Sequence, residues 1–273
     1  MINSINTRFF LIALTPCAFT ITACNSKDES YNSKERKLIW SDEFNYSGLP
    51  DATKWSYDIG DADGWGNNEL EYYTNADTSN AVVRNGYLYI TARKQKRETR
   101  DYTSARLISK GKGDWLYGRI EVKAKLPEGR GLWPAIWMLS TDWKYGGWPE
   151  SGEIDIMENV GYNPDSVFAS THTKKFNHIL GTQTTKGIAA KNLYTDFHVY
   201  AIVWDEKQID FYIDSTKYLT FKNTGKGWEE WPFDKRFHLL LNIAVGGNWG
   251  GKHGIDDGIF PQSMLVDYVR VYQ

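Results

Sequence analysis

The sequence predicts an all-β fold, an antiparallel β-sandwich of the jelly-roll type. Apolar and charged side chains alternate strictly from Arg119 to Leu126, which is the pattern of a half-buried strand. Turn-forming pairs such as Asn85-Gly86 separate several runs of this kind. Apolar residues do not recur at helical spacing over any long stretch. Many short strands joined by regular turns are typical of sandwich folds.

The N-terminal segment is predicted to be a secretion signal and not part of this fold. Arg8 precedes a short apolar run, Phe9 to Ala23, which a proline interrupts. Ile21-Thr22-Ala23-Cys24 resembles a bacterial lipobox, whose cysteine is lipidated when the preceding peptide is removed. We therefore expect residues 1–23 to be a lipoprotein signal peptide and Cys24 to be the lipidation site. An ordinary signal peptide is the alternative.

After Cys24 the chain is expected to form a tether and then one domain. Residues 24–36 are polar and charged, as in a flexible linker. Residues 37–273 contain no linker, repeat or charge block, so a single domain is the simplest interpretation. The stretch from Asn25 to Glu29 resembles the acidic signal that sends some Gram-negative lipoproteins to the cell exterior. We expect a secreted lipoprotein that is anchored to the bacterial outer membrane through Cys24 and faces outward.

Strand-like runs follow one another along this domain. Tyr87 to Arg93 alternates, with its apolar side chains on one face. Later runs are rich in β-branched and aromatic residues. They are Phe197–Trp204, Ile209–Ile213, His238–Val245 and Met264–Tyr272, with turn signals at Pro127-Glu128-Gly129, Asp214-Ser215 and Gly246-Gly247-Asn248.

The composition excludes some partners and favours others. The net charge is -2 over 273 residues, without a long basic stripe, which argues against nucleic acid and against an anionic membrane surface. The chain contains 12 Trp and 17 Tyr; part of these must lie in the core, but so much Trp also suits flat surfaces that stack on sugar rings. We expect a monomer that binds a polysaccharide.

The segment Gly152-Glu153-Ile154-Asp155-Ile156-Met157-Glu158 carries the chemistry. Glu153 and Asp155 alternate with isoleucines, so both acids face one side of a strand. A solvated strand edge would explain one or two acids, but the apolar flanks predict a central strand, where acids are rare. Neighbouring carboxylates push their pKa values apart, so that one is ionised as a nucleophile while the other stays protonated as an acid.

Glu158 lies five positions after Glu153, so strict alternation would place the two glutamates on opposite faces. One extra residue, here Met157, would return Glu158 to the acid face as a β-bulge. A carboxyl separation of about 5–5.5 Å is then plausible, which is the spacing of retaining glycosidases.

These residues resemble the active-site signature of glycoside hydrolase family 16, in the bulged form typical of laminarinases. The resemblance extends from Ile39 to Gln273. One small departure is Glu71, which stands where many relatives have Gln. Besides the acid segment the matching segments are Trp40-Ser41-Asp42-Glu43-Phe44, Gly66–Thr74, Gly131–Met138 and Val266–Tyr272.

The resemblance implies a retaining endo-glycosidase that cleaves internal β-1,3 bonds of laminarin-type β-glucan in a concave cleft. Glu153 would be the nucleophile, Glu158 the general acid/base, and Asp155 would tune the pair. Three alternatives stay open: the same chemistry on mixed-linkage β-glucan, the same chemistry on a galactan, or a non-catalytic glucan-binding lectin.

The resemblance also implies binding residues. Trp133 and Trp137 lie four positions apart on one strand face and are expected to line the sugar cleft, with core packing as the alternative. The other expected sugar-binding residues are Asn67, Arg106, His172 and Trp249.

No cofactor is expected for catalysis, but the resemblance implies a structural calcium ion on the side away from the cleft. Its ligands would come from Glu43, Asp267 and the carbonyl of Gly86.

Overall fold

The structure is a computed structural model that describes Met1 and residues 36–273. The predicted signal peptide, the lipidation site Cys24 and nearly all of the predicted tether lie outside the described residues. Residues 36–273 form one compact unit. Among the described residues, no helix is both long and apolar enough to cross a membrane.

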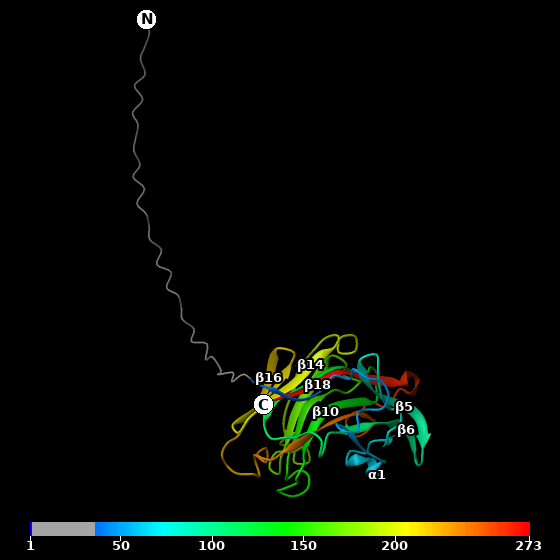
Figure 1. Cartoon of the computed structure of the whole chain (residues 1–273), viewed down its shortest axis with the longest axis horizontal. Coiled ribbons are helices and arrows are strands. Elements are labelled where there is room, and N and C mark those ends of the chain that lie inside the picture. The colour runs from blue at the N-terminus through cyan, green and yellow to red at the C-terminus, as the bar shows by residue number, and fades with distance from the viewer. Residues whose placement is uncertain (2–35) are drawn as a thin grey trace. The chain divides into compact units, whose positions relative to one another are not determined.

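This unit consists of two β-sheets, which confirms the predicted all-β sandwich (Figure 1). The first sheet has ten strands. Their order is β16 (Thr216–Lys222), β15 (Gln208–Ile213), β14 (His198–Trp204), β9 (Gly118–Lys125), β18 (Gln262–Tyr272), β5 (Tyr87–Arg97), β6 (Arg100–Ser104) and β3 (Glu71–Tyr73), with β1 (Leu38–Asp42) beside β18 and β4 (Ala81–Arg84) beside β5.

The second sheet has eight strands. Their order is β13 (Thr184–Ala189), β12 (Ser166–His172), β11 (Glu153–Glu158), β10 (Leu132–Ser140), β17 (Phe237–Val245), β7 (Arg106–Ile108) and β2 (Ser56–Asp58), with β8 (Asp114–Trp115) beside β17. The helical turns within residues 36–273 are short: α1 (Ala62–Trp65) and η1 (Asp257–Ile259).

The core lies between the sheets because alternate residues of most strands face inward. In β9, for example, Ile120, Val122 and Ala124 are fully buried, while the residues between them are partly exposed. The strand β17 is buried at all nine positions. It lies between β10 and β7 and packs against the other sheet on one face.

The predicted turn at Asn85-Gly86 is present. Both residues have positive φ, 54° and 79°, and they join β4 to β5 with Arg84 paired to Tyr87. Glycine and asparagine adopt this conformation most easily, and two such residues in sequence suit a two-residue hairpin loop. All the predicted strands are present within a few residues of their expected bounds.

The acid-bearing strand β11 lies between β10 and β12 and contains the predicted bulge. Its register shifts against both neighbours: Trp137 pairs with Asp155, but Ile136 pairs with Met157. The residue skipped in the pairing with β10 is therefore Ile156, one position before the expected Met157. Both side chains are fully buried, so the bulge is fixed by the core.

Candidate active site

A cleft of about 620 Å³ opens on the second sheet, on the face opposite the core. The strands contribute side chains to it at alternate positions. From β10 these are Trp133, Ala135, Trp137 and Leu139, whereas Ile136 and Met138 between them point into the core. The remaining lining residues include Trp65, Asn67, Glu69, Arg106, Trp148, Glu153, Asp155, Glu158, His178, Asn242 and Asn248.

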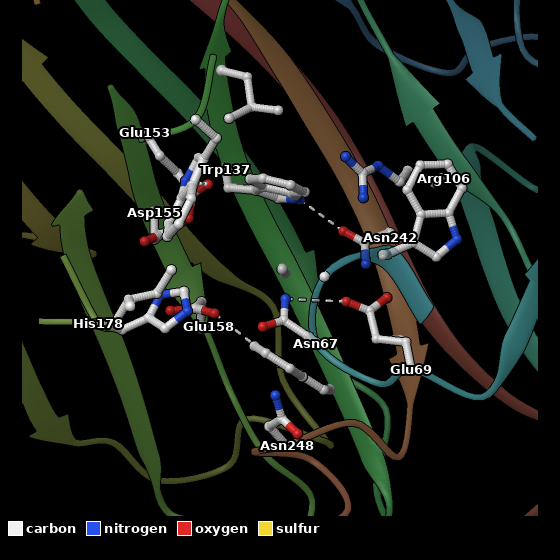
Figure 2. A pocket seen from close by; sticks show the side chains of 18 of the residues that line it. Asn67, Glu69, Arg106, Trp137, Glu153, Asp155, Glu158, His178, Asn242 and Asn248 are labelled. Atoms are coloured by element: carbon white, nitrogen blue, oxygen red, sulfur yellow. Dashed lines mark hydrogen bonds between the residues drawn. The ribbon is translucent and has the colours of Figure 1, made fainter. Parts of the chain in front are cut away.

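The three acids of β11 lie along one wall of the cleft (Figure 2). The bulge brings Glu158 to the face that Glu153 and Asp155 occupy, as the sequence predicts. Two indoles fix the outer carboxyls: Trp148 Nε1 donates to Glu153 Oε2 at 2.9 Å, and Trp133 Nε1 donates to Glu158 Oε1 at 3.0 Å. Each glutamate thus has one defined orientation.

His172 is paired with Glu153 across β11 and β12. Its Nε2 lies 3.2 Å from Asp155 Oδ2 and 3.8 Å from Glu153 Oε1. The imidazole is buried and is absent from the cleft lining, where His178 lies instead. The structure therefore places His172 against the carboxyls and not, as expected from the resemblance, on the sugar-facing surface.

Burial raises the pKa values of all three carboxyl groups. Burial and then the charge of Asp155 raise the pKa of Glu153 to about 8. Burial raises the pKa of Glu158 to about 7, with His172 opposing the shift and Glu153 adding to it. The pKa of Asp155 lies well above its usual value because of burial and the charge of Glu158. Since each ionisation disfavours the next, the three groups titrate as a set.

The opposite wall carries Arg106, whose guanidinium lies between two indoles. Its Cζ is 4.5 Å from the ring centre of Trp65 and 4.6 Å from that of Trp137. Its Nε also lies 3.0 Å from Asp58 Oδ2 on the neighbouring strand. Stacking of this kind holds both rings rigid as flat surfaces for a sugar.

Of the other residues expected to bind sugar, four line the cleft and one does not. Asn67, Arg106, Trp133 and Trp137 line the cleft as expected. Trp249 does not line it but packs edge-on against Trp133, with ring centres 5.5 Å apart, and so supports that ring from behind.

Sequence reasoning missed several lining residues. Trp148 precedes the acid segment and Glu69 and Asn248 lie in motifs that the sequence singles out, so their positions could have suggested a role. Trp65 ends the short helix α1, His178 stands in a turn, and Asn242 is one polar residue within an apolar run. For these three, only the folded arrangement reveals the cleft.

Within the described residues, one group of His and acid side chains could hold a metal: Glu153, Asp155 and His172, whose ligand atoms lie within 4.8 Å of one another. The expected calcium ligands lie elsewhere. β5 pairs with β18 up to Val266 and β1 pairs with it from Val269 on, so Asp267 lies in the gap between them.

Glu43 follows the end of β1 and Gly86 precedes β5, so the register brings both to the same junction as Asp267. A bulge at Asp267, where the pairing with β9 shifts, loosens the backbone there. The two carboxylates are already paired, Glu43 with Arg270 at 2.7 Å and Asp267 with Lys123 at 2.8 Å. A calcium ion bound by either carboxylate would therefore have to displace its cationic partner.

Comparison with known proteins agrees with this geometry. The model of Glycosyl hydrolases family 16 matches residues 68–270. A beta-glucanase from Rhodothermus marinus is 51% identical over 98% of this chain and 94% of its own length. The crystal structure of the laminarinase from Rhodothermus marinus superposes with a TM-score of 0.85 at 53% identity, covering 87% of this chain and 97% of that one.

A further solved structure contains a bound sugar. It is a non-specific endo-β-1,3(4)-glucanase of family GH16, which presents a 1,3-β-D-cellobiosyl-glucose at its active site. It has a TM-score of 0.85 and 43% identity and covers 88% of this chain and 95% of that one.

Because the three carboxyl groups are buried close together, replacing one of them by a neutral side chain should stabilise the folded protein. Between the ordinary pKa of 4.5 and the folded value of about 8, the folded protein keeps a proton on Glu153 that the unfolded chain has released. Stability of the wild-type protein therefore falls as pH rises through this range. Glu153→Gln and Glu158→Gln should escape this loss and be more stable by roughly 2–4 kcal/mol near pH 9, but almost unchanged near pH 4.

Urea unfolding across this pH range measures the effect. Glu206→Gln, at an exposed position, is the matched control and should change little. A gain that is equal at both ends of the pH range would contradict the account of the carboxyl cluster.

Proposed function

Because the chain belongs to glycoside hydrolase family 16, we propose that it cleaves internal β-1,3-glucosidic bonds of laminarin-type β-glucan with retention of configuration. It is a glycoside hydrolase with an all-β catalytic domain. The observation that carries the proposal is the position of Glu153 and Glu158. The bulge of β11 brings both to one wall of one cleft, and each is held by an indole N–H.

The two glutamates divide the reaction into two displacements. In the first, the Glu153 carboxylate attacks the anomeric carbon while Glu158 gives its proton to the departing oxygen. In the second, the Glu158 carboxylate takes a proton from water, and the hydroxide attacks the anomeric carbon and releases Glu153. Two inversions at that carbon restore the β configuration.

The surroundings of Glu158 support its role as the acid, whereas Glu153, whose pKa is raised further, must lose its proton before it attacks. Glu158 must hold a proton in the free enzyme, and burial raises its pKa to about 7. Glu153 must be ionised when it attacks. The charge of His172 and the N–H of Trp148 both favour its anion, against the burial and the repulsion from Asp155 that raise its pKa. Asp155 lies between the two and couples their ionisation.

The rival functions differ in what they require of the same cleft. A lectin would not need both carboxyls, and both line the cleft here. Mixed-linkage glucan is favoured as a second substrate by the likeness to a non-specific endo-β-1,3(4)-glucanase. A galactan requires the same acids but different sugar contacts. Side-by-side assays on laminarin, lichenan and agarose separate these substrates.

Replacing either glutamate by Gln tests the roles directly. Glu153→Gln and Glu158→Gln keep the side-chain shape but remove the charge or the proton. Each should lower kcat on laminarin by at least about 10³-fold, while laminarin binding stays within a few fold of wild type. Steady-state kinetics and calorimetric binding measure the two quantities.

Proton NMR of the earliest products tests the stereochemistry. The wild-type enzyme should first release the β-anomer. An initial α-anomer would mean inversion, and the nucleophile role of Glu153 would have to be withdrawn. Near-normal turnover by either Gln variant would equally refute the assignment.

This chemistry draws on no cofactor, but we propose a structural calcium ion at the junction of β1, β5 and β18. The convergence of Glu43, Gly86 and Asp267 supports it. An ion that binds only the folded state stabilises it by mass action. EDTA should therefore lower the melting temperature, and added calcium should restore it. An unchanged melting curve, with no calcium by elemental analysis, would exclude the site.

We also propose that the mature protein is a monomer, anchored to the outer membrane by lipid on Cys24 and facing outward. The lipobox-like residues before Cys24 support this. Cys24→Ala should remove the protein from the membrane fraction, and intact-cell protease treatment should digest the anchored wild-type protein. Wild-type protein found in the medium and cut before Cys24 would contradict the anchor.

A further inference from the structure

A second pair of buried carboxyls lies on the other wall of the cleft. Glu69 lines the cleft with only 6% of its surface exposed, and Glu71, at the start of β3, is fully buried. Residues two apart in an extended chain point to the same side. The two carboxyls lie close enough for each to shift the pKa of the other, and the mechanism above uses neither.

The surroundings of Glu71 suit a neutral acid. Its Oε2 accepts from the backbone N–H of Val245 at 2.5 Å. Its Oε1 is buried and finds no donor among the described residues. A proton on that oxygen turns it into a donor, and the acceptor beside it is the carboxylate of Glu69. Burial and the charge of Glu69 accordingly raise the pKa of Glu71 well above its usual value.

The surroundings of Glu69 suit an anion. Tyr73 donates its hydroxyl to Oε2 at 3.1 Å, and Asn67 donates its Nδ2 to Oε1 at 3.4 Å. The guanidinium of Arg106 also favours the charged form, although burial still raises the pKa of Glu69. Two donors thus reach this carboxylate, the charge of Arg106 favours its ionised form, and a protonated Glu71 would add a third donor.

The hydrogen bonds continue through Tyr73 to the floor of the cleft, where Figure 2 shows the bond between Trp137 and Asn242. Tyr73 accepts from Asn242 Nδ2 at 2.9 Å, and Asn242 Oδ1 accepts from Trp137 Nε1 at 2.7 Å. Every donor in this chain is oriented toward Glu69. Its charge therefore fixes the direction of the amides and of the Trp137 ring, which all face the cleft.

We propose that Glu69 binds sugar hydroxyls as a carboxylate, and that Glu71 is the positioning residue that keeps this carboxylate ionised and in place. The ligand class is a neutral glycan, whose hydroxyls donate to charged acceptors more strongly than to neutral ones. The proposal rests on the proposed function, since the ligand is the same glucan chain that the catalytic glutamates cleave.

The pair should make substrate affinity depend on pH. When Glu71 loses its proton, it stops donating to Glu69 and repels it. Other titratable or charged groups that face the pair are Tyr73, Arg106 and, across the cleft, Glu158. Glu158 and its partner Glu153 also ionise in this range, and ionisation of the free enzyme changes kcat/KM as well as kcat. The part of an alkaline rise in KM that Glu71→Gln abolishes therefore reports on Glu69 and Glu71.

The experiment compares kcat and KM on laminarin for the wild type, Glu69→Gln and Glu71→Gln from about pH 5 to about pH 9.5. Glu69→Gln should raise KM about tenfold at every pH, with kcat changed less than about threefold. In the wild type, KM should rise at alkaline pH. Glu71→Gln should remove this rise, because a Gln amide donates to Glu69 at all pH values and still accepts from Val245.

Glu98→Gln, on the exposed β5–β6 turn, is the matched control, and melting curves check that each variant folds. A wild-type KM in Glu69→Gln, or an unaltered alkaline rise in Glu71→Gln, would overturn the proposal. Lack of laminarin turnover by the wild type would instead overturn the proposed function. The same comparison would then be made on whichever of lichenan or agarose the enzyme cleaves.

Discussion

Side chains of a regular strand alternate between its two faces, and this constraint governs the whole site. Without the register shift in β11, Glu153 and Glu158 would point to opposite sides, one into the cleft and one into the core. The shift occurs at Ile156 and Met157, which are both fully buried. Core packing on one face of the sheet therefore sets the geometry of the acids on the other. The two carboxyls cannot be separated without repacking the interior.

The central strand β10 then links the two walls. It pairs with β11 on one side and with β17 on the other. Its Trp133 donates to Glu158 on the first neighbour, and its Trp137 donates to Asn242 on the second. Because both indoles stand on one strand four positions apart, a shift of β10 would disturb both walls together. The acid wall and the sugar-binding wall thus keep a fixed separation.

The sequence predicts the parts of this arrangement that are local. Alternation reveals β9 and the acid face of β11, and the five-residue spacing of Glu153 and Glu158 reveals the bulge. The spacing predicts Met157 as the bulged residue, whereas the pairing with β10 skips Ile156. The difference is one position, because a buried side chain at either place returns Glu158 to the acid face. His172 shows the limit of local reasoning: its pairing with Glu153 depends on the register of β12. Trp65 enters the cleft from the single turn of α1 and His178 from a turn after β12, and no periodicity in the sequence describes either segment.

The choice of hydrogen-bond donors explains how the acids can both be fixed in place and exchange protons. Arg270 holds Glu43 on the other sheet and lowers its pKa, so that carboxyl stays ionised. Trp133 and Trp148 orient Glu158 and Glu153 without adding a positive charge. Burial and mutual repulsion therefore dominate, and the pKa values stay near neutral. A basic residue in place of Trp133 would hold the Glu158 carboxylate as firmly, but it would remove the proton that the leaving oxygen must receive.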